Sequence, residues 1–131
     1  MKSVSDLLLR GFIAILLGWA GFQKIRGDEA SIEVFTTLEM EPFGRHLIGI
    51  LEIGGALLIL FPPSIVAGAI LTWGLMAGAT LAHLTKLGIS GPAGTLFLSA
   101  LAALVSSTIV LYLNRSRSRL LNKMFPPRQS G

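Results

Sequence analysis

The chain has 131 residues, of which 52% are hydrophobic and 14% charged, and its mean hydropathy is +0.71. Since about a quarter of the residues of a soluble domain are charged, this composition excludes an ordinary soluble protein and indicates one compact membrane domain. The absence of cysteine excludes disulfides, thiolate metal sites and thiol redox chemistry carried by the chain itself.

Residues 7–25 are the first predicted transmembrane helix, because this apolar run is long enough to cross a bilayer. The run is interrupted by Arg10 and lacks the small-residue cleavage site of a signal peptide, so a retained helix is favoured over a cleaved leader. Positions spaced three or four apart form one stripe of small residues with basic ends, which predicts a packed face: Arg10, Ala14, Leu17, Gly21 and Lys24.

Residues 26–45 form an acidic connector, for which two interpretations stay open. Ile32, Phe35 and Leu38 recur at three-residue spacing, which favours a short helix lying on the membrane surface. Asp28 would cap the start of this helix, and the proline and glycine that follow would end it. A solvated loop explains the polar composition equally well.

The second predicted transmembrane helix, residues 46–61, carries one carboxylate, Glu52, in an otherwise apolar run. A carboxylate at this depth is costly when it faces lipid, so Glu52 is expected to face the bundle interior and to have a partner. Gly49 and Gly55 share its helical face, and small residues there let a neighbouring helix approach closely.

The third and fourth predicted helices, residues 64–86 and 94–113, complete an all-α bundle of four transmembrane helices. Only a pair of prolines separates the second helix from the third, so these two are expected to be antiparallel neighbours. Gly74 and Gly78 form a small-xxx-small pair, which predicts that their face packs within the bundle. The fourth helix has no charge and is expected to be a packing helix.

Residues 115–131 form a basic tail that is expected to contact anionic lipid. If both termini lie on one side of the membrane, that side carries seven of the eleven Lys and Arg residues, and the acidic connector lies on the other side. This bias predicts that both termini are cytoplasmic. Nucleic-acid binding is not expected, because no aromatic residues alternate with the charges of the tail.

The predicted topology brings polar residues of three helices to the outer half of the membrane. Lys24, Glu52 and His83 are therefore expected to share a ligand or proton site, with Gln23 and Thr80 beside them. A second interpretation explains the same residues without a ligand: a buried ion pair that only fixes the register of the helices. No second histidine or cysteine lies at metal-ligand spacing from His83, so no metal site is expected.

Three motifs, in order along the chain, resemble the DoxX and DoxX-like family of small membrane proteins. They are Arg10 with Gly18-Trp-Ala-Gly-Phe-Gln-Lys24, then Leu51-Glu-Ile-Gly-Gly-Ala-Leu57, then Gly78-Ala-Thr-Leu-Ala-His83. The resemblance covers residues 10–112 and implies a four-helix membrane protein. Members of the family are linked to quinone or thiosulfate oxidation, to membrane oxidoreductase complexes of oxidative-stress defence and, in animals, to receptor-assembly chaperoning.

The resemblance implies an accessory or quinone-interacting component of a membrane oxidoreductase in a bacterial cytoplasmic membrane. Quinone is then the expected ligand, and a redox protein or a second copy of the chain is the expected partner. Whether the chain is itself an enzyme stays open. Two alternatives remain: a small transporter in which Glu52 exchanges protons, and a chaperone or assembly factor without catalysis. Drug exporters of this size usually carry their carboxylate in the first helix, which counts against the transporter.

Overall fold

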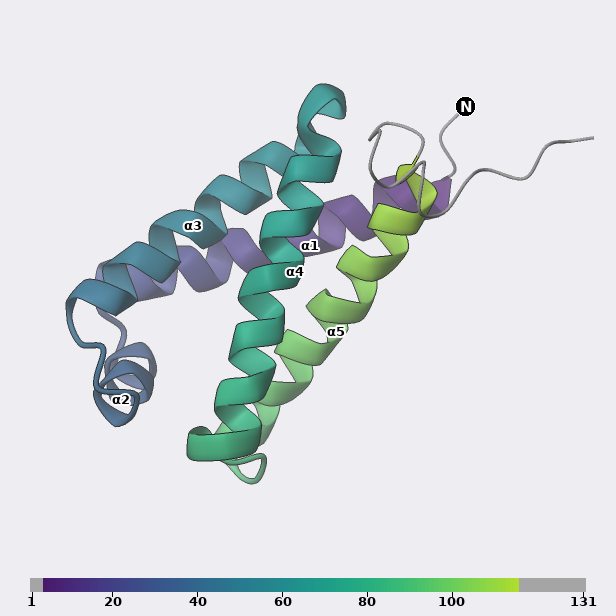
Figure 1. Ribbon diagram of the computed structural model, residues 1–131. Coiled ribbons are helices and arrows are strands. Elements are labelled where there is room, and N and C mark those ends of the chain that lie inside the picture. Colours follow the sequence, from purple (N-terminus) through teal and green to yellow (C-terminus); the bar gives the residue numbers. More distant parts are fainter. Residues whose placement is uncertain (1–3, 116–131) are drawn as a thin grey trace, which may run out of the picture.

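The computed structural model describes residues 4–115, which are built from helices and contain no strand (Figure 1). Four helical segments are long and apolar enough to cross a membrane, which confirms the predicted all-α bundle of four transmembrane helices. The elements are α1 (Val4–Arg26), α2 (Glu29–Thr37), α3 (Phe43–Leu60), a 3₁₀ turn (Pro62–Ser64), α4 (Ile65–Ala82), a π-helical turn (His83–Leu87) and α5 (Pro92–Leu113).

The connector between α1 and α3 contains the short helix α2, so the helical interpretation of this segment is correct and the loop interpretation is not. Two details differ from the prediction. The helix ends at Thr37, before the proline and glycine that were expected to end it, and the side chain of Asp28 forms no capping hydrogen bond. Asp28 instead pairs with Arg26 at 3.6 Å. Most of the predicted basic tail and Lys2 lie outside the described residues.

Helices α1 and α3 cross at a contact between two glycines. A Cβ atom added to Gly21 would lie 2.6 Å from the carbonyl oxygen of Gly49, and one added to Gly49 would lie 3.0 Å from the carbonyl oxygen of Gly21. Both glycines are buried. The two backbones therefore approach each other more closely than any larger residues would allow.

Each of these two helices also caps the other with an arginine. The last carbonyl groups of a helix have no partner within it. Arg10 of α1 donates to the carbonyls of Ile59 (3.2 Å) and Leu60 (3.4 Å) at the end of α3, and Arg45 of α3 donates to the carbonyl of Lys24 near the end of α1. Each arginine is held by an acid four residues before it, as the pairs Asp6–Arg10 at 3.1 Å and Glu41–Arg45 at 2.8 Å. The pairing fixes α1 and α3 as an antiparallel unit.

Helix α4 packs on this unit and α5 returns along α4. Gly68 brings α4 against the end of α3, since a Cβ there would lie 2.6 Å from the backbone nitrogen of Ile59. Gly55 lies between α1 and α4, where an added Cβ would touch Leu17 and Thr72 at ordinary contact distance, 3.5 Å. The buried apolar core includes Ile13, Leu17, Ile59, Ile65, Ala69, Met76, Ala103 and Val110.

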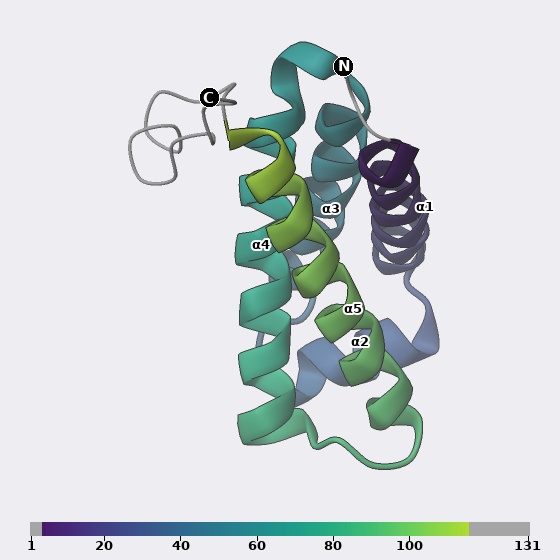
Figure 2. The same ribbon diagram turned by 90° about the vertical axis from the view of Figure 1, so that its right-hand side faces the viewer.

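Helices α1 and α5 meet at one end of the bundle and diverge toward the other (Figures 1 and 2). At the closed end Asn114, which follows α5, donates a hydrogen bond to Asp6 of α1. At the open end the connector helix α2 lies across the space and contacts α1, α3 and the π-helical turn. This arrangement leaves a wedge between the helices, with α2 closing its wide end.

Candidate functional site

The wedge contains a cavity of about 580 Å³. Its walls come from all five α-helices and are mainly apolar, with Leu17, Trp19, Phe35, Ile48, Met76 and Leu96 among the lining residues. The polar side chains in its walls are Gln23, Lys24, Asp28, Ser31, Glu52, His83 and Ser99. An apolar cavity of this size with a few convergent polar groups has the properties of a small-molecule site.

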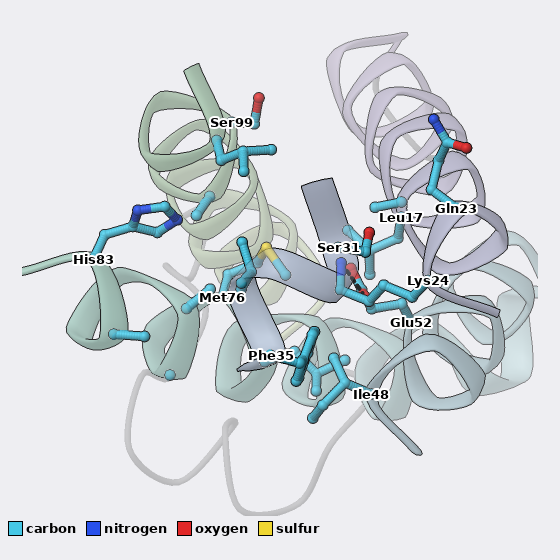
Figure 3. A pocket seen from close by; sticks show the side chains of 18 of the residues that line it. Leu17, Gln23, Lys24, Ser31, Phe35, Ile48, Glu52, Met76, His83 and Ser99 are labelled. Carbon is cyan, nitrogen blue, oxygen red and sulfur yellow. Dashed lines mark ion pairs between the residues drawn. The ribbon is translucent and has the colours of Figure 1, made fainter. Parts of the chain in front are cut away.

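An ion pair between Lys24 and Glu52 forms one wall of the cavity (Figure 3). The Nζ atom of Lys24 lies 2.8 Å from Oε1 of Glu52, and the side chains are 20% and 2% exposed, respectively. Among the described residues Oε1 has no other partner. The expectation that Glu52 faces the bundle interior and is paired therefore agrees with the geometry.

The glycine crossing explains how this pair forms. A Cβ on Gly21 would lie 3.2 Å from the Cβ of Glu52, and a Cβ on Gly49 would lie 3.1 Å from the Cβ of Lys24. Each glycine thus makes room for the charged residue of the other helix. Because helical side chains lean toward the N-terminus of their own helix, the two long side chains of this antiparallel pair lean toward each other and meet beside the crossing.

His83 lines the same cavity but is not a partner of Glu52. Figure 3 shows its imidazole on the wall opposite Lys24 and Glu52. The ring is 5% exposed, its Nδ1 lies 3.0 Å from the carbonyl oxygen of Gly88, and its centroid lies 5.9 Å from that of Phe97. The predicted site residues Lys24, Glu52 and His83 therefore lie on two separated polar walls of one cavity rather than in one cluster.

The other predicted residues are divided between the cavity and its surroundings. Gln23 lines the cavity, where its Oε1 accepts a hydrogen bond from Nε of Arg26 at 3.1 Å. Thr80 does not line it and donates to the carbonyl of Met76 at 2.8 Å. Thr80 therefore hydrogen-bonds within its own helix and is not part of the cavity lining.

Gly49 and Gly55 lie in helix contacts, whereas Gly74 and Gly78 do not. Gly74 and Gly78 are exposed, and a Cβ on either would meet no atom within 4 Å. Both line the cavity. The placement corrects the expectation that this face of α4 packs against a helix, because the two glycines face the open space of the cavity.

Sequence reasoning missed two features. One is the buried cluster of Asp6, Arg10 and Asn114, for which the only local signal is the four-residue spacing of Asp6 and Arg10. The other is that α2 forms part of the cavity wall with Ser31 and Phe35, and that Phe35 is only 5% exposed. The three-residue apolar spacing of α2 indicated a buried face but not what it covers.

Within residues 4–115, no group of three His, Asp or Glu side chains is placed to hold a metal ion. Among known sequence families, the model of the DoxX-like family matches residues 8–107. Comparison with curated proteins and with solved structures gives no match.

Proposed function

Because the chain belongs to the DoxX-like family of membrane proteins, we propose that it is a quinone-interacting component of a membrane oxidoreductase or oxidative-stress system. The proposal rests on one observation: an apolar cavity of about 580 Å³ within the helix bundle has a buried lysine–glutamate pair in its wall. A quinone head group is an uncharged ring with carbonyl oxygens, and its tail is apolar. The cavity offers partners for both parts.

The donor set of the cavity fits a carbonyl ligand. A lysine ammonium has three N–H donors, and the ion pair of Lys24 with Oε1 of Glu52 does not require all of them. A ligand carbonyl that approaches the pair can therefore accept a further hydrogen bond from Lys24. Side chains such as Leu17, Phe35 and Met76 supply the apolar contacts for the ring.

The charge of the site favours an uncharged ligand. Lys24 and Glu52 neutralise each other, and Asp28, the other ionised group in the wall besides this pair, is paired with Arg26. An anionic ligand would meet the Glu52 carboxylate, and residues 4–115 place no unpaired Lys or Arg in the wall to compensate it. A neutral quinone avoids this repulsion, which in an apolar environment is stronger than in water.

The location of the cavity suits a ligand dissolved in the bilayer. Trp19 and Leu96, on α1 and α5, are 61% and 43% exposed and belong to the lining, so the cavity reaches the outer surface of the bundle between these helices. The proposed setting is a bacterial cytoplasmic membrane, and the bias of Lys and Arg predicts that both termini lie in the cytoplasm. The cavity then lies in the outer half of the membrane, with α2 at the outer aqueous boundary.

The test is quinone binding to the protein purified into lipid nanodiscs. Lys24→Met removes the donor while keeping an apolar stem, and should weaken the binding of a short-tailed benzoquinone by about tenfold, as expected for loss of one hydrogen bond to a charged group. Lys86→Met is the matched control, because Lys86 is exposed and does not line the cavity. Equal affinity for the parent and both variants would contradict the proposal.

A proton-coupled transporter is the second candidate, since Glu52 is a carboxylate buried within a membrane-spanning segment, the position of proton-carrying residues in many pumps and transporters. Proteoliposomes with an imposed pH gradient separate the two candidates. Proton flux that depends on an added substrate and disappears in Glu52→Gln favours transport. Quinone binding without such flux favours the redox role.

A further inference from the structure

The second polar wall of the cavity has a defined hydrogen-bonding character. The Nδ1 atom of His83 lies 3.0 Å from the carbonyl oxygen of Gly88. A carbonyl oxygen only accepts hydrogen bonds, so Nδ1 must carry the proton of this contact. In the neutral imidazole the other ring nitrogen, Nε2, is then an acceptor.

The protein supplies no donor to this acceptor among the described residues. Nδ1 makes the one hydrogen bond of the His83 side chain within this part of the chain. Ser99, the other labelled polar residue on this side in Figure 3, donates its hydroxyl hydrogen to the carbonyl of Thr95 at 3.0 Å. Phe97, which lies beside the imidazole, has no polar atom to offer. His83 thus presents an unpaired acceptor in a cavity wall.

We propose that His83 is the residue that selects the ligand, by accepting a hydrogen bond at Nε2 from a ligand hydroxyl group. This inference rests on the proposed function and specifies it: the cavity takes the hydroxyl-bearing, reduced form of an aromatic ligand in preference to the carbonyl form. The two walls then have different tasks. Lys24 donates to an oxygen atom of the ligand, and His83 accepts from an O–H group on the opposite side.

The chemistry of the two ligand forms explains the preference. Each oxygen of a hydroquinone both donates and accepts, so one molecule can accept from Lys24 and donate to His83. Each oxygen of a quinone only accepts, so its lone pairs would face the lone pair of Nε2. A site whose acceptor faces the ligand discriminates against an analogue that lacks the matching donor, because the acceptor then loses water without gaining a partner.

The experiment compares two ligand pairs on the protein in lipid nanodiscs. The first pair is a short-tailed benzoquinone and its hydroquinone, measured anaerobically. The second is para-decylphenol and its methyl ether, which differ in the O–H donor but have no redox chemistry. We expect the hydroxyl form of each pair to bind about five- to tenfold more tightly, which lies within the range expected for one neutral hydrogen bond.

His83→Asn tests the residue itself. The amide nitrogen of asparagine can take the position of Nδ1 and donate to the carbonyl of Gly88, but asparagine has no atom at the position of Nε2. The preference for the hydroxyl form should therefore fall to less than about twofold. Thr85→Val is the matched control, since Thr85 lies in the same π-helical turn, is exposed and bonds only to its own helix. The control should keep the full preference.

The outcomes are distinguishable. Equal affinity for phenol and ether in the parent protein overturns the inference without the need for any variant, and so does a preference that survives in His83→Asn. Either of these two results, together with quinone binding that depends on Lys24, would leave the proposed function standing and rule out the role of His83. If no member of either pair binds, both fail together.

Discussion

Asn114 donates a hydrogen bond from Nδ2 to Oδ1 of Asp6 over 2.7 Å, although the two residues are 108 positions apart in the chain. Both residues are almost completely buried, at 3% and 2% exposure. The contact fastens the end of α5 to the start of α1. Since α1 and α5 diverge from this point, the contact marks the closed end of the wedge. The cavity lies within this wedge.

Replacing Asn114 by alanine should destabilise the bundle. The substitution leaves a buried carboxylate oxygen of Asp6 without this donor, which typically costs about 1–3 kcal/mol. The thermal unfolding temperature in mild detergent should fall, while Thr85→Val, which removes only an exposed local hydrogen bond, should change it little. An unchanged unfolding temperature for Asn114→Ala would show that the hydrogen bond between Asn114 and Asp6 does not hold the helices together.

Arg10→Met should be more damaging. It removes the cation paired with Asp6 and the donor to the last carbonyls of α3, and breaking a buried pair by deleting one partner costs about 3–5 kcal/mol. Arg26→Met is the comparison, because Arg26 is also an ion-paired arginine of α1 but its side chain is 55% exposed. Its loss should cost less than about 1 kcal/mol. Similar effects of the two substitutions on unfolding would argue against reciprocal capping of α1 and α3.

The sequence was sufficient to predict the four spans and the pairing of Glu52. Hydropathy and length determine the spans, and a carboxylate in an apolar run needs a partner whatever the detailed packing. Lys24 was a candidate because charge count and chain reversal placed it at the same depth as Glu52. Hydropathy, length and charge are properties of the sequence itself and do not depend on how the helices pack.

The divergence of α1 from α5 could not be predicted in this way. It depends on the hydrogen bond between Asp6 and Asn114 at one end of the bundle and on the position of α2 at the other end. For that reason the sequence placed His83 beside Glu52 instead of across a cavity from it, and it assigned Gly74 and Gly78 to a helix contact. Residue spacing shows which side chains share a face, but not what that face meets.

The glycine crossing can be tested with matched alanine substitutions. Gly21→Ala places a Cβ 2.6 Å from the carbonyl oxygen of Gly49 and should force the helices apart, with a cost of about 1–3 kcal/mol and weaker quinone binding through the displaced Lys24. Gly18→Ala lies one turn earlier, where a Cβ meets nothing within 4 Å, and should be neutral or slightly stabilising. Equal unfolding temperatures for the two variants would mean that the crossing tolerates a methyl group.

Gly78→Leu distinguishes a cavity wall from a packing surface. Because a Cβ on Gly78 meets no atom within 4 Å and the residue lines the cavity, the bundle should stay folded while the leucine occupies ligand space, so benzoquinone affinity should fall by about tenfold or more. Gly54→Leu is the control, as Gly54 also has open space around it but is not in the lining. Loss of folding in Gly78→Leu alone would restore the packing role for this glycine.

The most direct measurement of the central claim is photo-crosslinking of the protein in nanodiscs with a benzoquinone that carries an aryl azide, followed by mass spectrometry of the peptides. If the quinone occupies the cavity, the label should appear on α2 near Ser31 and Phe35 and on α4 near Met76, and excess unlabelled quinone should remove it. Labelling confined to outward-facing residues such as Ile15, Ile50 and Ile70, and insensitive to competitor, would show that the quinone only dissolves in the surrounding lipid and would contradict the account.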